Sequence, residues 1–247
     1  MKLFNTKRKR RIFIPITVFL VILLISVIFC AIYLSDYYRA DNAEIEAFMP
    51  NMTTEVYENG KICFGNSNSE VGFVFYPGGK VEYTAYIPLM RALATDGIFC
   101  VLYEMPFNLA VFDSDAAEDV SLEYPDIKSW YIGGHSLGGA MAASMISDNL
   151  DKFKGIVFLG AYSTADLSAS DLRALSIYGS EDLVMDREAY DENKKNLPTD
   201  FTEFIIEGGC HAYFGMYGEQ RGDGVATITP EQQITITAHC ILEFIYE

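Results

Sequence analysis

A glycine-rich segment between a strand pattern and a helix pattern most constrains how this chain can fold. Residues 133–139 read Gly-Gly-His-Ser-Leu-Gly-Gly. The run before them is aromatic and β-branched, and the run after them consists mostly of helix formers. Glycines two positions either side of Ser136 allow a tight turn without Cβ clashes. The segment predicts a strand–turn–helix unit with a serine at the helix N-terminus, although an ordinary glycine-rich turn would share this pattern.

From residue 61 onward, apolar strand-like runs alternate with helix-like runs. The predicted strands are 61–64, 71–76, 98–103, 130–133, 155–159, 175–178 and 201–206, and the predicted helices are 87–94, 136–149, 187–196 and 230–246. Continuous apolar strands separated by helices predict an α/β fold with a mostly parallel sheet and helices on both faces. Only about 15 residues separate the strands 155–159 and 175–178, too few for a large lid domain.

The N-terminal part of the chain has a different character. The basic cluster 7–11 precedes an apolar run, 12–34, that is long enough to span a bilayer as a helix and offers no clear cleavage site. Basic residues normally stay on the cytoplasmic side. We therefore expect a basic cytoplasmic segment (1–11), a single-pass transmembrane anchor in the cell membrane (12–34), a stalk (35–60) and an extracytoplasmic α/β domain (61–247).

Charge is distributed unevenly between these parts. Six of the 18 lysines and arginines precede Ile12, and no acidic residue precedes Asp36. The rest of the chain carries 12 basic and 34 acidic residues, a formal charge of −22. Such a domain should be soluble and should not bind nucleic acid or anionic lipid headgroups.

The five cysteines, Cys30, Cys63, Cys100, Cys210 and Cys240, show no spacing typical of a metal site. No other motif indicates a metal or an organic cofactor, and we expect neither. An exported domain could pair Cys63, Cys210 or Cys240, but the sequence leaves their pairing open, as it leaves the oligomeric state.

A serine hydroxyl becomes a nucleophile only when a base lies within hydrogen-bond reach. Of the three histidines, His135 adjoins Ser136 and should point away from it, and His239 lies inside the closing helix. His211 follows the last strand in a loop, where the sites of open α/β sheets lie. His211 is therefore the candidate base, with an ordinary polar loop histidine as the alternative.

The base needs a carboxylate that fixes its tautomer. Asp182 follows the strand 175–178 and gives the chain order Ser136, Asp182, His211. Glu181, Asp186 and Asp191 lie nearby and compete for this role. The acidic pair at 181–182 can also be a solvated loop.

An oxyanion needs two donors. We expect the backbone N–H of Leu137 to be one, and the loop 77–80 to supply the other from Gly79 or, as second choice, Lys80. Several apolar residues nearby either line a substrate pocket or simply pack in the core: Tyr76, Tyr83, Tyr86, Met105 and Phe107.

Taken together, residues 61–246 resemble the α/β-hydrolase superfamily, and within it the bacterial dienelactone-hydrolase-like and carboxylesterase-like branch. The resemblance lies in YPGG (76–79), GGHSLGG (133–139), YGSED (178–182), EGGCHAYFG (207–215) and YGEQRGDG (217–224). It implies an α/β-hydrolase fold and ester hydrolysis through an acyl-enzyme, with Ser136 as nucleophile, His211 as base and Asp182 as supporting acid. Two departures are the serine, where true dienelactone hydrolases have cysteine, and the added anchor.

The sequence thus predicts a membrane-anchored serine hydrolase for esters of small or medium acyl groups. Its partners would be a small-molecule ester and, through the N-terminal helix, a membrane. Two alternatives remain: acyl transfer to an alcohol by the same three residues, and a non-catalytic binding module on an inherited fold.

Overall fold

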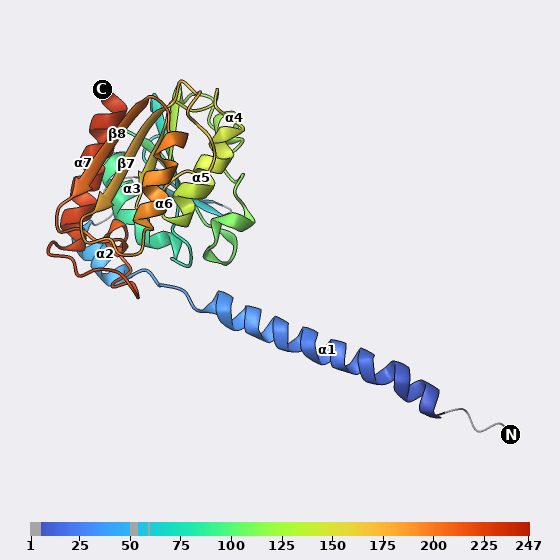
Figure 1. The fold of residues 1–247 in the computed structure, drawn as a ribbon. Coiled ribbons are helices and arrows are strands. Elements are labelled where there is room, and N and C mark those ends of the chain that lie inside the picture. Colours follow the sequence, from blue (N-terminus) through green and yellow to red (C-terminus); the bar gives the residue numbers. More distant parts are fainter. Residues whose placement is uncertain (1–5, 50–53, 59) are drawn as a thin grey trace. The chain divides into compact units, whose positions relative to one another are not determined.

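The computed structural model of the chain describes residues 6–49, 54–58 and 60–247 and divides into two compact units, Met1–Tyr37 and Tyr38–Glu247 (Figure 1). Lys2 of the expected basic segment, together with residues 50–53 and 59 of the expected stalk, lies outside the described residues.

The first unit contains one long helix, α1 (Thr6–Ser35). Its stretch Ile14–Ser35 is long and apolar enough to cross a membrane, by length and composition. The same composition is found in signal sequences, so the helix alone does not distinguish an anchor from a cleaved leader.

The second unit is built on one eight-stranded sheet. Its strands, in chain order, are β1 (Glu55–Glu58), β2 (Lys61–Phe64), β3 (Val71–Tyr76), β4 (Phe99–Tyr103), β5 (Ser129–His135), β6 (Gly155–Leu159), β7 (Arg173–Gly179) and β8 (Asp200–Ile206). They lie in the order β1-β2-β4-β3-β5-β6-β7-β8. β1 and β2 are antiparallel to their neighbours, and the six strands from β4 to β8 are parallel. The prediction of a mostly parallel sheet is confirmed.

Helices cover both faces of this sheet (Figure 1). The α-helices of the unit are α2 (Asn42–Phe48), α3 (Ile87–Thr95), α4 (Val120–Glu123), α5 (Leu137–Ser147), α6 (Arg187–Asn193) and α7 (Pro230–Tyr246), and the short 3₁₀ turns are η1 (Tyr83–Tyr86), η2 (Pro106–Asn108), η3 (Ala110–Phe112), η4 (Lys194–Asn196) and η5 (Ala212–Phe214). In the described structure, no helix lies between β6 and β7, as the short spacing there predicts.

The alternation of side chains along each strand produces two apolar layers. In β3, Phe73 and Phe75 pack under α3 and α7, whereas Val74 and Tyr76 pack under α4 and α5. Because the parallel strands are buried on both faces, their sequences are continuously apolar rather than alternating. The carboxyl ends of β3, β5, β6, β7 and β8 therefore meet at one edge, where the candidate site residues follow them.

Part of the segment expected as a stalk belongs instead to the folded unit. The strand β1 pairs with β2 as an edge strand, and α2 contacts α3. Ile45 of α2 is buried in the core. Arg91 of α3, which is only 4% exposed, also holds the segment by donating to Glu55 of β1 (2.5 Å) and Glu46 of α2 (2.8 Å). A buried guanidinium needs acidic partners. Here they come from a polar segment, which is why the sequence predicts a stalk rather than a part of the fold.

All five cysteines fall within the described residues and are free thiols. Cys63, Cys100, Cys210 and Cys240 are buried, so the pairings left open by the sequence do not form in this structure.

Candidate active site

Ser136 occupies the turn between β5 and α5. Its backbone has φ 51° and ψ −120°, in a region that non-glycine residues rarely adopt. The flanking glycines explain how the turn closes. A Cβ on Gly138 would overlap the carbonyl oxygens of Tyr76 and Pro77, and one on Gly134 would lie 2.5 Å from Gly139 N. Backbone strain at a serine is a feature of functional turns.

The Ser136 turn opens onto a cavity of about 410 Å³. The backbone N–H of Ser136 donates to Leu159 O at the end of β6 (2.9 Å), which places the serine beside Gly160. The cavity lining is mostly apolar and consists of Ser136, Leu137, Ala140, Met141, Gly160, Ala161, Tyr162, Thr164, Val184, Met185 and Asp186. A serine hydroxyl and an apolar space large enough for an acyl chain thus lie side by side.

None of the five expected pocket residues lines this cavity. Tyr76, Tyr86 and Met105 are buried in the core, and Phe107 is exposed. Tyr83 does not line the cavity either. The alternative that these residues pack rather than bind holds for the buried three, because β3, η1 and the segment after β4 direct them into the two apolar layers.

Asp182 and His211 form a buried pair at the ends of β7 and β8. The Asp182 Oδ2 to His211 Nδ1 distance is 2.8 Å, and both side chains are at most 1% exposed. The second oxygen, Oδ1, accepts the N–H groups of Val184 and Met185 at 2.9 Å. With both oxygens held in this way, the carboxylate directs Nδ1–H of the imidazole toward itself and leaves Nε2 as the basic nitrogen.

The competing carboxylates have other partners. Glu181 accepts from its neighbour Ser180 (3.0 Å), Asp186 caps α6 by accepting from Ala189 N (3.0 Å), and Asp191 pairs with Lys194 (3.0 Å). Asp182 is the one predicted acid that the structure brings to His211.

His211 Nε2 is buried and has no hydrogen-bond partner within the described part of the chain. A Cβ placed on Gly160 would lie 2.9 Å from His211 Nδ1 and 3.1 Å from Asp182 Oδ2. Gly160 therefore lies against the Asp182–His211 pair. The residue before it, Leu159, accepts the backbone N–H of Ser136, so Gly160 lies between the pair and the Ser136 turn. No hydrogen bond joins Ser136 Oγ to His211 in the described structure. Hydrogen bonds between catalytic groups are often long in the absence of substrate and tighten when it binds.

His135 contributes to the site in a way that the sequence did not reveal. Its ring centroid lies 4.4 Å from that of His211, and its Nδ1 is 2.7 Å from Tyr86 Oη. Tyr86 Oη in turn accepts the N–H of Gly78 (3.0 Å). Burial, and then the nearby His211, lower the pKa of His135 well below its usual value, so this imidazole is neutral near pH 7.

The expected oxyanion donors lie close together. A Cβ on Gly79 would be 3.1 Å from the Leu137 side chain, and the N–H of Gly79 has no acceptor among the described residues. The N–H of Lys80 donates to Asn108 O (2.7 Å), so its backbone donor is already used. Of the two candidates in this loop, the geometry favours Gly79.

Cys210 is unsuited to nucleophilic chemistry. Burial, followed by the negative charge of Asp223, raises the pKa of its thiol to about 12. Since the thiolate is the reactive form, Cys210 is inert at neutral pH. Its backbone has a different role, because the side chain of Gln233 in α7 accepts its N–H (3.0 Å) and donates to its C=O (2.8 Å).

Gln233 is another site residue that the sequence did not reveal, and it fixes the position next to His211. The only signal for it is a polar residue at a buried position of an otherwise amphipathic helix. As for metals, no group of three or more His, Cys, Asp or Glu side chains positioned to hold an ion occurs among the described residues.

Comparisons with known proteins agree with this architecture. The family model described as "Alpha/beta hydrolase family" matches residues 72–235. Three solved structures are similar: a CIB-like hydrolase from Thermoplasma acidophilum (15% identity, TM-score 0.55), a dienelactone hydrolase from Anabaena variabilis (15%, 0.58) and the thioesterase domain from the curacin biosynthetic pathway (12%, 0.57). Each covers 78% of this chain, and 98%, 97% and 100% of its own length is matched, respectively. No curated protein matches the chain.

At these identities, the similar structures establish the fold alone. Together with the family match, they confirm the fold class predicted from the sequence.

Proposed function

Because the chain belongs to the alpha/beta hydrolase family, we propose that it is a membrane-anchored serine hydrolase that cleaves carboxylic esters through an acyl-enzyme. In this proposal Ser136 is the nucleophile, His211 the base and Asp182 the acid that orients the base. The N–H groups of Leu137 and Gly79 bind the oxyanion.

One observation above all supports the proposal. A buried carboxylate holds Nδ1 of a buried histidine at 2.8 Å, and Nε2 of the same ring has no partner among the described residues. Buried polar atoms are normally satisfied, and the exceptions call for a functional explanation. A base waiting for the proton of a serine hydroxyl is such an explanation.

The proposed reaction uses these groups in sequence. Ser136 Oγ attacks the ester carbonyl carbon while its proton passes to His211 Nε2. Asp182 stabilises the imidazolium, and the carbonyl oxygen becomes an oxyanion that accepts the N–H groups of Leu137 and Gly79. The C–O bond to the alcohol then breaks, and His211 returns the proton to the departing oxygen. Water then gives a proton to His211 Nε2 and attacks the acyl carbon. The bond from that carbon to Ser136 Oγ breaks, His211 returns the proton to Ser136 Oγ, and the acid is released.

The cavity beside Ser136 suggests the acyl groups that fit. Its lining is dominated by apolar side chains, and its one charged residue is Asp186. An apolar chain gains free energy on entering such a space, at about 0.8 kcal/mol per buried CH₂. A carboxylate in the acyl group would instead meet the charge of Asp186. These features favour esters of uncharged small or medium acyl groups.

The membrane part of the proposal rests on α1 and the basic residues before it. The apolar helix is long enough to span a bilayer, and the cluster 7–11 favours a cytoplasmic N-terminus. This arrangement would place the hydrolase unit outside the cytoplasm.

The proposal can be tested by covalent labelling. A fluorophosphonate reacts with a serine only when an oriented base activates it. We expect the full chain in detergent to gain one label at Ser136, identified by peptide mass spectrometry. Ser136→Ala should remain unlabelled, and Ser144→Ala, which removes an exposed serine from the same helix α5, should label like the unaltered chain. Absence of labelling in a folded, unaltered chain would remove the basis for the serine mechanism.

A further inference from the structure

The loop that carries Asp223 lies against both of the loops that carry the Asp182–His211 pair. We propose that Asp223 is a positioning residue that holds these two loops together and thereby fixes the hydrogen bond between Asp182 and His211. The inference rests on the proposed function for its kinetic consequence, but its structural consequence can be measured separately.

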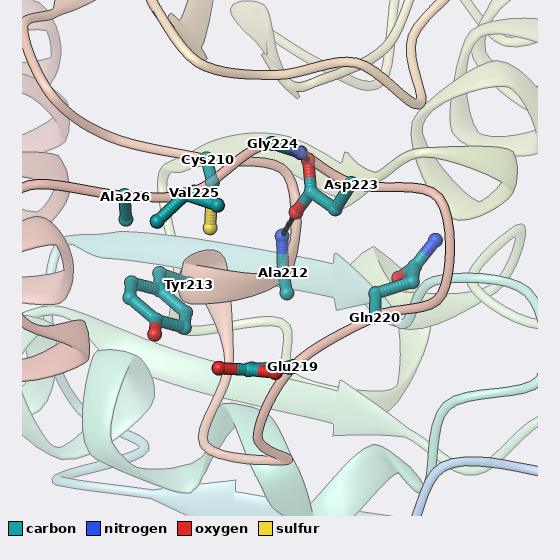
Figure 2. Close-up of a pocket in the computed structure, with 9 residues that line it drawn as sticks. All are labelled: Cys210, Ala212, Tyr213, Glu219, Gln220, Asp223, Gly224, Val225 and Ala226. Atoms are coloured by element: carbon teal, nitrogen blue, oxygen red, sulfur yellow. Dashed lines mark hydrogen bonds between the residues drawn. The ribbon is translucent and has the colours of Figure 1, made fainter.

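The carboxylate of Asp223 bonds to both loops. Its Oδ2 accepts the N–H of Ala212, the residue after His211, at 2.8 Å, as the dashed line in Figure 2 shows. Its Oδ1 accepts the N–H of Leu183, the residue after Asp182, at 3.4 Å. A single half-buried side chain thus connects the residues that immediately follow the two members of the pair.

The neighbouring Gly224 reinforces this contact. It lies so close to the backbone carbonyl of Glu181 that an added Cβ would overlap the oxygen. Glu181 directly precedes Asp182. The loop therefore touches the acid-bearing segment on both sides of Asp182, through Gly224 before it and Asp223 after it. Asp223 Oδ1 also accepts the N–H of Gly224 at 2.8 Å, which orients the carboxylate within its own loop.

The residues directly before and after His211 are also held by hydrogen bonds. The side chain of Gln233 holds the backbone N–H and C=O of Cys210 before it. Asp223 holds the N–H of Ala212 after it. Because Gln233 approaches from helix α7 and Asp223 from a loop, the two anchors are independent. Removing Asp223 would free one side of His211 while leaving the other in place.

The consequence for the reaction follows from geometry. Asp223 lies outside the cavity beside Ser136, so it touches neither the acyl group nor the reacting atoms. Its loss should therefore leave the Michaelis constant, KM, within about threefold of its original value. Misplacing a proton-transferring group by about 1 Å can cost on the order of 10²-fold in rate. We expect Asp223→Ala to lower kcat by about 10–100-fold.

The experiment compares three variants of the full chain in detergent. Asp223→Ala removes both acceptors. Asp223→Asn keeps one oxygen for Ala212 but turns an amide NH₂ toward the donors of Leu183 and Gly224, so its kcat should fall by an intermediate factor. Glu219→Ala is the matched control. Glu219 lines the same cavity as Asp223 (Figure 2) but makes no hydrogen bond to either loop in the described structure, so its kcat should be unchanged.

A second readout does not depend on turnover. The Nδ1–H proton of His211, held by Asp182, should give a low-field proton NMR resonance that is lost in Asp182→Asn. Circular dichroism first verifies that each variant is folded. We then expect the resonance to broaden or disappear in Asp223→Ala and to remain in Glu219→Ala. Should Asp223→Ala fail to fold, Asp223→Asn provides the same comparison.

Three outcomes would overturn the proposal: a folded Asp223 variant that keeps both kcat and the resonance, one that loses kcat but keeps the resonance, and one that loses the resonance but keeps kcat. If the unaltered chain hydrolyses no ester, the proposed function fails, and the resonance alone then decides the role of Asp223.

Discussion

The rings of His135 and His211 lie 4.4 Å apart, centroid to centroid, although one ends β5 and the other lies in the loop after β8, a strand that is not a neighbour of β5 in the sheet. His135 ends β5 and points to the α3–α7 side, where Tyr86 and Phe214 also contact it. The candidate base is thus packed on a second imidazole. The two rings differ in their surroundings, since His211 has a carboxylate partner and His135 has only a phenol.

This packing predicts how stability depends on pH. Burial lowers the pKa of His135 in the folded state. Below about pH 6.5 this imidazole is therefore protonated in the unfolded chain but stays neutral in the folded one. The unfolded state therefore binds more protons, and the contribution of His135 to the free energy of unfolding falls as pH drops, by about 1.4 kcal/mol per pH unit. Above about pH 6.5 this effect is absent.

The check is unfolding of the full chain in detergent at pH 7.5, 6.5 and 5.5, for the unaltered chain and for His135→Gln. The variant should lose stability less steeply with acid, although it starts from a lower value because Tyr86 has lost its hydrogen bond to His135 Nδ1. Parallel curves for the two proteins would show that His135 does not carry the dependence.

A second prediction separates the Asp182–His211 pair from His239 by function. Asp182→Asn should lower kcat by on the order of 10⁴-fold, because an amide cannot hold His211 in the required tautomer. His211→Ala should be at least as damaging. His239→Ala is the control, because this side chain is 71% exposed on α7 and paired with Glu243. Rates on p-nitrophenyl acetate, with circular dichroism to verify folding, decide the matter, and activity lost in His239→Ala alone would contradict the assignment.

A third prediction concerns substrate size. The described structure has no helix between β6 and β7 that could act as a lid over the cavity. We therefore expect dissolved short-chain esters to be preferred, with no rise in rate at the solubility limit. A series of p-nitrophenyl esters from acetate to palmitate measures this. A maximum at long chains with interfacial activation would indicate a lipase instead.

A fourth prediction concerns topology. Six basic residues precede Ile12, whereas only Arg39 lies between Leu34 and Lys61. Protease added to spheroplasts of an expression host should therefore digest the hydrolase unit and leave a cytoplasmic marker intact. Replacing the five basic residues 7–11 by glutamine should reduce the digested fraction. Full protection of the unaltered chain would refute this orientation.

The sequence predicts most of the sheet because buried parallel strands have a strong local signature. The strands 71–76 and 155–159 and the helix 230–246 are found at the predicted residues. Each is an apolar or amphipathic run bounded by glycine, proline or polar residues, so its limits depend on nearby residues alone. The Asp182–His211 contact was also predictable, because both follow neighbouring strands, β7 and β8, at the same edge.

What the sequence does not predict depends on contacts between distant residues. The polar segment with α2 and β1 joins the folded unit through distant contacts, among them the binding of Glu46 and Glu55 by Arg91 and the burial of Ile45 in the core. The contact of His135 with His211 depends on how far apart β5 and β8 lie in the sheet. No local sequence pattern predicts that distance. Gln233 and Asp223 form hydrogen bonds with backbone groups of the loop around His211. Every residue except proline offers the same backbone groups, so the sequence does not indicate these bonds.

The four buried free thiols make it possible to measure how often the folded unit transiently opens. Burial raises the pKa of Cys63, Cys100, Cys210 and Cys240, to about 12 for Cys210 and about 11 for Cys240. At pH 8 these thiols therefore stay largely protonated, and alkylating agents react with the thiolate. Alkylation of these four cysteines should therefore be slow in the folded unit and faster when the unit transiently opens. Cys30 of α1 is exposed and free, so its uptake must be separated by peptide mass spectrometry. The rate of iodoacetamide uptake by the four buried cysteines then measures that opening.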